Sequence, residues 1–191
     1  MDIESVKKEA VIFETNPFGD KYLYRANRTT FKKKPADEVF NKYLKNAFSK
    51  EETFYVISGS DSGLLIKYLA SQSELSPDNR YLIVELDSII DEISSLYQQE
   101  LATGNIRICS IDEWFDIANE MELDAYIYNN KIQFKRSLAA RDLADIAYHS
   151  LSEKLQKEIE NAVFLVNSSL GNNLFLLRQL QNISENILPA N

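Results

Sequence analysis

Short apolar runs alternate with amphipathic segments through the middle of the chain. The runs at residues 54–57 and 81–84 are continuously apolar, and the run at residues 106–109 is apolar apart from Arg107, whereas residues 63–71 and 88–101 place apolar side chains at helical spacing. Continuous apolar runs are typical of parallel strands that are covered on both faces. Each intervening segment is long enough to return the chain to a neighbouring parallel strand by a right-handed crossover. The pattern predicts an α/β fold built on a Rossmann-like, mostly parallel sheet.

The alternation continues after the third apolar run. Residues 112–121 have a helical pattern, residues 125–128 read as a fourth strand, and the asparagine pair that begins at Asn129 is typical of a turn. A further short strand is expected at residues 132–134. We therefore expect a core domain over residues 51–136.

Residues 1–50 carry a different pattern. Strand-like composition at residues 11–14 and 22–24 flanks the sequence Asn-Pro-Phe-Gly-Asp at residues 16–20, which predicts a β-hairpin. A proline then opens the helical pattern of residues 35–48. We expect this region to form an N-terminal hairpin and helix.

Residues 137–191 have the pattern of a helical extension. Two amphipathic stripes are expected, with an interruption at the polar residues 167–173. The first stripe consists of Leu151, Leu155, Ile159, Val163 and Val166, and the second of Leu174, Leu177, Leu180, Ile183 and Ile187. The second stripe either packs back on the sheet or is left exposed, in which case it predicts a homodimer through the C-terminal helices. The closing Ile-Leu-Pro reads as a hinge that leads to a missing downstream domain.

Composition narrows the classes of protein to which the chain can belong. Hydrophobic residues make up 45% of the 191 positions, which is enough for a buried core, yet no apolar stretch approaches the about 18 residues of a membrane span. A net charge of −8 argues against a nucleic-acid partner, and the lysine run at residues 32–34 is interpreted as a solvated loop. The single cysteine, Cys109, excludes an internal disulfide and favours the cytoplasm. No membrane partner is expected.

The turn after the first apolar run is the strongest candidate site. It reads Ser58-Gly59-Ser60-Asp61-Ser62-Gly63, and such glycine turns bring the backbone close to a nucleotide or S-adenosylmethionine. Asp61 stands where a second glycine is wanted, and its carboxylate would repel a pyrophosphate. We therefore favour a tight turn with a helix cap at Asp61 or Ser62, and a phosphate cradle is the alternative.

Further polar residues follow the later strands. Glu85, Asp112 and Asn129 would meet the turn at the carboxyl edge of one parallel sheet, which is where such folds bind ligands. Each has a structural alternative, and for Asp112 the favoured one is the N-cap of the following helix. The candidate ligand-binding residues are Ser58, Gly59, Asp61, Gly63, Glu85, Asp112 and Asn129.

The sequence contains few residues in patterns typical of catalytic sites. His149 is the only histidine and has no recognisable nucleophile motif beside it, and the sequence lacks a spaced set of metal ligands. We expect no catalytic residue, no metal and no cofactor in this chain. The competing interpretation is a methyltransferase-like or nucleotide-binding Rossmann domain with its own small ligand, using Gly59, Glu85 and Asp112.

Four stretches resemble a known family. They are YVISGSDSGLLIKYL, YLIVELD, DAYIYNNKIQFKRSLAARD and NSSLGNNLFLLRQLQNISENILPA, and the similarity covers nearly the whole chain. The chain resembles the N-terminal part of the motility accessory factor (Maf) family of bacterial flagellin glycosyltransferases, also labelled 6-hydroxymethylpterin diphosphokinase-like. The resemblance implies a Rossmann-like N-terminal domain, a central domain that uses a nucleotide sugar, and a helical C-terminal region.

The function follows from the resemblance as an expectation. Family members are thought to transfer nonulosonic acids from a CMP-activated donor to Ser or Thr of flagellin. The central glycine-rich motif has no counterpart in this sequence, so no transferase residue can be carried over to it. We expect a non-catalytic module that positions substrate or binds a partner, either flagellin or the protein's own downstream transferase domain.

Overall fold

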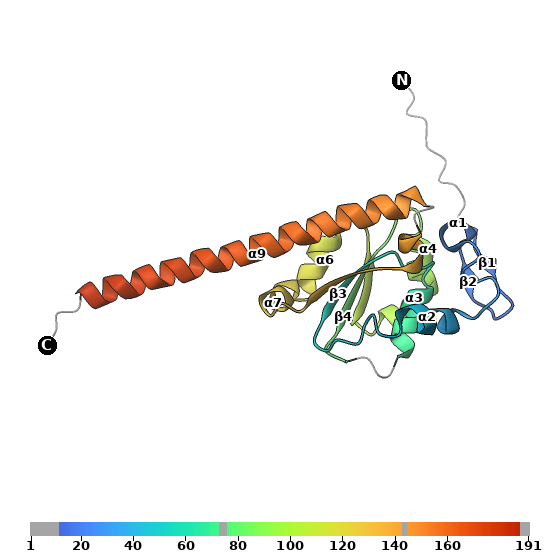
Figure 1. The fold of residues 1–191 in the computed structure, drawn as a ribbon, viewed down its shortest axis with the longest axis horizontal. Coiled ribbons are helices and arrows are strands. Elements are labelled where there is room, and N and C mark those ends of the chain that lie inside the picture. The colour runs from blue at the N-terminus through green and yellow to red at the C-terminus, as the bar shows by residue number, and fades with distance from the viewer. Residues whose placement is uncertain (1–11, 73–75, 143–144, 188–191) are drawn as a thin grey trace, which may run out of the picture.

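The core of the fold is a four-stranded parallel sheet with the strand order β5-β4-β3-β6 (Figure 1). The computed structural model describes residues 12–72, 76–142 and 145–187, with side chains in the last helix described as far as Ser169. The sheet strands are β3 (Phe54–Ser58), β4 (Arg80–Val84), β5 (Ile106–Cys109) and β6 (Ile132–Arg136). The predicted α/β class is confirmed.

The two central strands are the most deeply buried part of the sheet. All of β3 is buried, and Val56 and Ile57 pair with Leu82 and Ile83 of β4. The edge strand β6 is half-buried along its whole length and alternates apolar with polar side chains. Helices therefore cover both faces of the centre, as expected for continuous apolar strands.

Right-handed crossovers divide the helices between the two faces. The chain moves from β3 through β4 to β5 by way of α3 (Leu64–Ser71), α4 (Ile90–Leu96) and α5 (Gln98–Leu101). It returns from β5 to β6 through α6 (Trp114–Glu120) and α7 (Leu123–Tyr128) on the opposite face. Helix α5 packs against α3, and α6 packs against α7.

The strand expected at residues 125–128 is wrong, because this segment belongs to helix α7. Leu123 and Ile127 are buried while Asp124, Ala125 and Tyr128 are exposed, which is helical spacing. A short apolar run of this kind does not distinguish the two periods by itself. The fourth parallel strand is instead β6, which overlaps the short strand expected at residues 132–134.

The N-terminal hairpin is confirmed as the antiparallel pair β1 (Glu14–Thr15) and β2 (Lys21–Tyr22). Asn16 holds its turn, since its Oδ1 accepts hydrogen bonds from the amides of Phe18 and Asp20 at 2.9 Å. The short helix α1 (Tyr24–Asn27) follows the hairpin. The start of the first expected strand, at residue 11, lies outside the described residues.

The helix opened by Pro35 is α2 (Ala36–Leu44), which is shorter than the expected 35–48. The helix expected over residues 88–101 is divided at Tyr97 into α4 and α5. A short helix, α8 (Leu138–Arg141), follows β6 directly. These differences concern ends and breaks, which periodicity defines least well.

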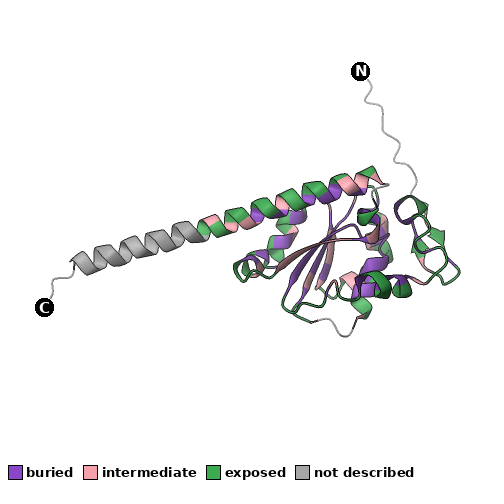
Figure 2. Cartoon of the chain, viewed as in Figure 1, coloured by how far each residue is buried: buried purple, intermediate pink, exposed green. Residues whose placement is uncertain are grey.

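Helix α9 (Ile146–Ile187) is a single element of 42 residues, so the interruption expected at residues 167–173 is wrong. At 1.5 Å per residue it is about 63 Å long. Its first half packs against α7 and β3 and carries both buried and exposed positions (Figure 2), whereas its second half runs out beyond the sheet (Figure 1). None of the described helices combines the length and apolar character that crossing a membrane requires.

Exposure along α9 changes near Ala162. Leu155, Ile159 and Ala162 are buried, whereas Phe164 is 70% exposed and Leu165 is 62% exposed. The side chains of the second stripe, Leu174 to Ile187, and residues 188–191, on which the expected hinge falls, lie outside the described residues.

Candidate functional site

The glycine turn between β3 and α3 has an unusual backbone. Gly59 and Gly63 have φ angles of 79° and 85°, and Asp61 and Ser62 between them also have positive values, 51° and 62°. Non-glycine residues in this region cost of order 1–3 kcal/mol each and persist only when surrounding contacts hold them. The contacts of this turn therefore indicate its role.

Asp61 is fully buried and holds two distant segments. Its carboxylate accepts hydrogen bonds from the amides of Leu138 at 2.9 Å and Ala139 at 2.7 Å, and from Asn27 Nδ2 at 2.9 Å. The expected cap of the following helix is wrong, because Gly63 holds the N-cap position of α3 without a side-chain hydrogen bond. Asp61 instead caps the first two amides of α8 from a distant part of the chain, while Ser137 is the N-cap residue of that helix. Burial raises the pKa of Asp61, and these hydrogen bonds and the charge of Arg141 oppose the rise.

Ser62 joins the turn to the N-terminal region. Its Oγ accepts a hydrogen bond from the amide of Leu23 at 2.9 Å and donates one to Asn27 Oδ1 at 2.5 Å. Both polar ends of the Asn27 side chain are therefore bonded to this turn. The turn fastens α1 to the sheet and leaves neither of its central side chains pointing into an open site.

Glu85 ends β4 and is also fully buried. One carboxylate oxygen accepts from the amide and the hydroxyl of Ser60, at 2.7 and 2.5 Å, and the other accepts from the amide of Leu86 at 2.8 Å. Burial raises the pKa of Glu85. The residue expected to bind ribose hydroxyls instead binds the glycine turn.

The space above both glycines is filled by the chain itself. A Cβ at Gly59 would lie 2.5 Å from Ser137 Oγ and 2.9 Å from Cε1 of Tyr148, and a Cβ at Gly63 would overlap the ring of Tyr97. In a nucleotide site the ligand makes this close approach to glycine. Here the ring of Tyr148 in α9 approaches Gly59, and the ring of Tyr97, at the break between α4 and α5, approaches Gly63.

Helix α9 is joined to the same edge of the sheet by polar contacts. The hydroxyls of Ser58 and Ser152 are 2.6 Å apart and buried. The hydroxyl of Tyr148 is buried close to the carboxylate of Glu85. Burial, and then the nearby carboxylate of Glu85, raise the pKa of Tyr148 well above its usual value. The phenol is therefore neutral at physiological pH.

Two of the predicted site residues do not join this cluster. Asp112 is exposed and pairs with Lys154 at 3.2 Å. It is not the N-cap of α6 either, because Glu113 holds that position. Asn129 follows helix α7 and precedes β6, which places it at the amino edge of the sheet. The expectation that Asn129 ends a strand is wrong, because residues 125–128 belong to helix α7.

The remaining chemical candidates are inert in this arrangement. His149 Nε2 lies 3.3 Å from Glu153 on the half-exposed surface of α9. Burial raises the pKa of Cys109 to about 12, so its thiol is not a nucleophile at neutral pH. Within the described ranges, no group of three His, Cys, Asp or Glu side chains could hold a metal ion.

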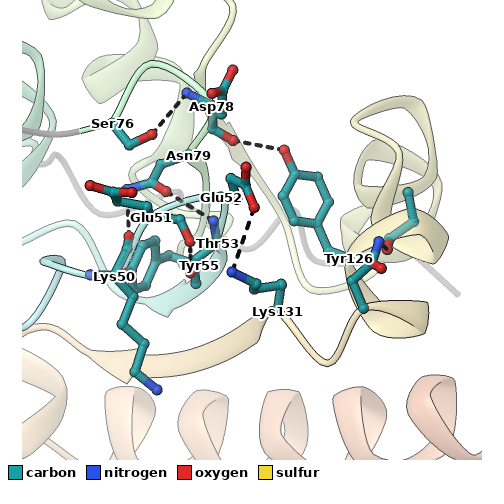
Figure 3. Close-up of polar contacts among 12 residues, drawn as sticks. Lys50, Glu51, Glu52, Thr53, Tyr55, Ser76, Asp78, Asn79, Tyr126 and Lys131 are labelled. Carbon is teal, nitrogen blue, oxygen red and sulfur yellow. Dashed lines mark hydrogen bonds and ion pairs between the residues drawn. The ribbon is translucent and has the colours of Figure 1, made fainter.

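Asn79 organises the opposite, amino edge of the sheet, a role that the sequence analysis missed (Figure 3). Its Oδ1 accepts from the amide of Thr53 at 2.9 Å, and its Nδ2 donates to the carbonyl of Lys50 at 3.0 Å and to the hydroxyl of Tyr81 at 3.1 Å. These bonds fasten the loop before β3 to the start of β4. The available signal was an asparagine directly before an apolar strand.

Comparison with known proteins identifies no relative of this chain. No family model, curated protein or solved structure matches the chain.

Proposed function

We propose that this chain is a non-catalytic interaction module, in which the carboxyl edge of the sheet anchors helix α9 and binds no ligand. The observation that carries the proposal is the filled space above Gly59, where Ser137 and Tyr148 stand in the place of a nucleotide. A ligand could enter only if the first turns of α9 moved away.

The hydrogen bonds of the edge support the same reading. The acceptors of Asp61 and Glu85, which a ligand would need, are taken by the chain's own amides and hydroxyls. Displacing Asp61 would leave the amides of Leu138 and Ala139 without partners. Buried unpaired amides cost about 1–3 kcal/mol each, so ligand entry would be opposed by several kcal/mol.

The part proposed to face a partner is the exposed surface of α9 at Phe164 and Leu165, near the middle of that helix. Phe164 and Leu165 are largely exposed next to each other, although large apolar side chains are seldom exposed in clusters on monomers. Because the sequence resembles the motility accessory factor family, we place this module in a cytoplasmic glycosyltransferase that modifies flagellin with nonulosonic acid. Flagellin, the downstream transferase domain and a second copy of the chain are the partners that α9 would meet.

Ligand titration tests the non-catalytic part of the proposal. Calorimetry with S-adenosylmethionine, NAD and CMP should detect no binding tighter than about 100 μM that involves the crevice above Gly59. Tyr148→Ala serves as a comparison, because removing the ring opens that space. Tight binding to the unaltered chain, with NMR shifts at Gly59 and Glu85, would establish the competing nucleotide-binding function.

Substitution on α9 tests the interaction part. The double variant Phe164→Ser, Leu165→Ser, placed in the natural gene of the source bacterium, should lower flagellin glycosylation and motility while the protein accumulates normally. Tyr128→Ser is the control, since Tyr128 is also an exposed aromatic residue but lies on α7. Equal glycosylation in all three strains would contradict the proposal.

A further inference from the structure

An open cleft lies between helices α2 and α8, outside the filled edge of the sheet. Its volume is about 440 Å³, within the usual range of small-molecule sites. The lining residues used below are Thr30, Lys34, Lys42, Tyr43, Leu138 and Arg141. The cleft is thus bordered by the lysine-rich loop, by α2 and by α8.

The cleft is positive in a chain whose net charge is −8. Lys34, in the loop before α2, pairs with Glu38, the one carboxylate among the lining residues, but no carboxylate lies within ion-pair distance of Lys42 or Arg141 in the described part of the chain. The positive charges of Lys42 and Arg141 are therefore not paired with a carboxylate among the described residues. The buried carboxylate of Asp61 is near enough for the charge of Arg141 to oppose the rise in the pKa of Asp61, but the two form no ion pair.

The cationic groups are held in place. Arg141 Nε donates to the carbonyl of Arg136 at 3.1 Å, and Asp61 caps the helix that carries Arg141. Lys42 Nζ lies 4.9 Å from the centre of the Tyr43 ring. That ring is 54% exposed and presents a flat surface beside the charges.

We propose that the cleft between α2 and α8 binds an organic phosphate of nucleotide size. Lys42 and Arg141 contact the phosphate oxygens, and the guanidinium matches phosphate geometry by its planar fork. The ring of Tyr43 stacks on the planar part of the ligand, a contact that tolerates different bases. Thr30 supplies a hydroxyl, and Leu138 covers the apolar side. This site is separate from the crevice above Gly59.

Titration with AMP, adenosine and inorganic phosphate tests the proposal, followed by calorimetry and by amide shifts in NMR. AMP should bind with a dissociation constant below about 1 mM at low ionic strength and at least about tenfold more weakly near 0.5 M NaCl, where charges are strongly screened. Adenosine should bind at least about tenfold more weakly than AMP, because it lacks the phosphate. Inorganic phosphate should shift the amides around both Arg141 and Lys42, but it should bind more weakly than AMP because it offers no planar group to the ring of Tyr43.

Matched variants assign the binding to the cleft. Lys42→Gln and Arg141→Gln should each weaken AMP binding by about tenfold or more, as expected for loss of a charge-assisted hydrogen bond. Lys157→Gln is the control, because it removes an equal charge from an exposed position on α9. Lys42 is exposed on α2, so its variant keeps the test informative if Arg141→Gln unfolds the domain.

Three outcomes would overturn the proposal. They are no AMP binding up to about 10 mM, equal affinity for adenosine and AMP, and equal loss of affinity in Lys157→Gln. If AMP shifts appear at Gly59 and Glu85 while Lys42→Gln binds normally, the non-catalytic function proposed above fails as well.

Discussion

The two edges of the parallel sheet are both closed by polar side chains, but by different chemistry. At the carboxyl edge two fully buried carboxylates, Asp61 and Glu85, accept hydrogen bonds from amides and hydroxyls, without a salt bridge among the described residues. At the amino edge the neutral side chain of Asn79 holds the loop before β3, and the nearby ion pair, Lys131–Glu52, is exposed (Figure 3).

This difference indicates how strongly the stability of each edge depends on its central polar residue. A buried carboxylate is costly to desolvate and is retained only when its hydrogen bonds are complete. A buried amide carries no charge, so losing it leaves only unpaired neighbours. The carboxyl edge should therefore be the more fragile of the two, and the more sensitive to pH.

Removing the Asp61 carboxylate should have the largest effect. Asp61→Ala leaves two amides of α8 and Asn27 Nδ2 unpaired, and should lower the free energy of unfolding by about 3–5 kcal/mol. Urea denaturation followed by circular dichroism measures this. Asp112→Ala, on the same side of the sheet but exposed, should cost less than about 1 kcal/mol. Similar losses in the two variants would remove the basis for treating Asp61 as the centre of this edge.

A methyl group at Gly59 should be nearly as damaging. In Gly59→Ala the Cβ would overlap Ser137 and Tyr148, and the positive φ adds backbone strain, so we expect a loss of about 2–4 kcal/mol. Gly104→Ala is the matched control, since Gly104 has the same φ of 79° with nothing within 4 Å of the added Cβ. Thermal unfolding of both variants separates steric overlap from backbone strain. If Gly104→Ala lowers the free energy of unfolding by as much as Gly59→Ala does, steric overlap with Tyr148 contributes nothing to the loss.

At the amino edge, Asn79→Ala should cost about 1–3 kcal/mol, because the Thr53 amide loses its partner and the Lys50 carbonyl keeps only the Tyr55 hydroxyl. The loss should be the same at pH 5 and pH 8, since the groups involved do not titrate in this range. Chemical denaturation at both values checks this. A loss that exceeds that of Asp61→Ala would reverse the order of the two edges.

The smallest change concerns the pH profile of stability. Burial raises the pKa of Glu85 in the folded chain, so the folded state holds its proton at higher pH than the unfolded state does. Stability from this group is therefore present below the unfolded pKa, near 4.5, and is lost as pH rises through the folded value. Glu85→Gln should show a shallower decline than the unaltered chain above about pH 4.5. Parallel slopes in urea titrations at several pH values would contradict the assignment.

Much of the core was predictable because its signals are local. Continuous apolar runs identified β3 and β4, a run interrupted only by Arg107 identified β5, and the Asn-Pro-Phe-Gly-Asp turn identified the hairpin. The segment that became α7 was misread because a short apolar run fits both a strand and a helix. Because of that error, Asn129 was expected at the carboxyl edge of the sheet, whereas it lies at the amino edge.

The candidate site was located correctly in part, but its partners could not be found from sequence. The turn of residues 58–63 and Glu85 do meet at the carboxyl edge. The residues that occupy it, Ser137 and Tyr148, come from distant elements, and Ala139, which binds Asp61, is 78 positions away from that aspartate. No local pattern marks such contacts, because they arise from packing between elements.

The sequence alone determined the alternation of strands and helices, the hairpin, and the polar residues of the glycine turn, since each depends on side chains that are neighbours along the chain. Only the tertiary structure decided that Asp61 caps α8, that Tyr148 occupies the space above Gly59, and that Lys42 and Arg141 border one cleft. The physical reason is distance along the chain. Hydrophobic period and turn propensity act within a few residues, whereas crevice filling and charge clustering depend on how the crossovers bring remote elements together.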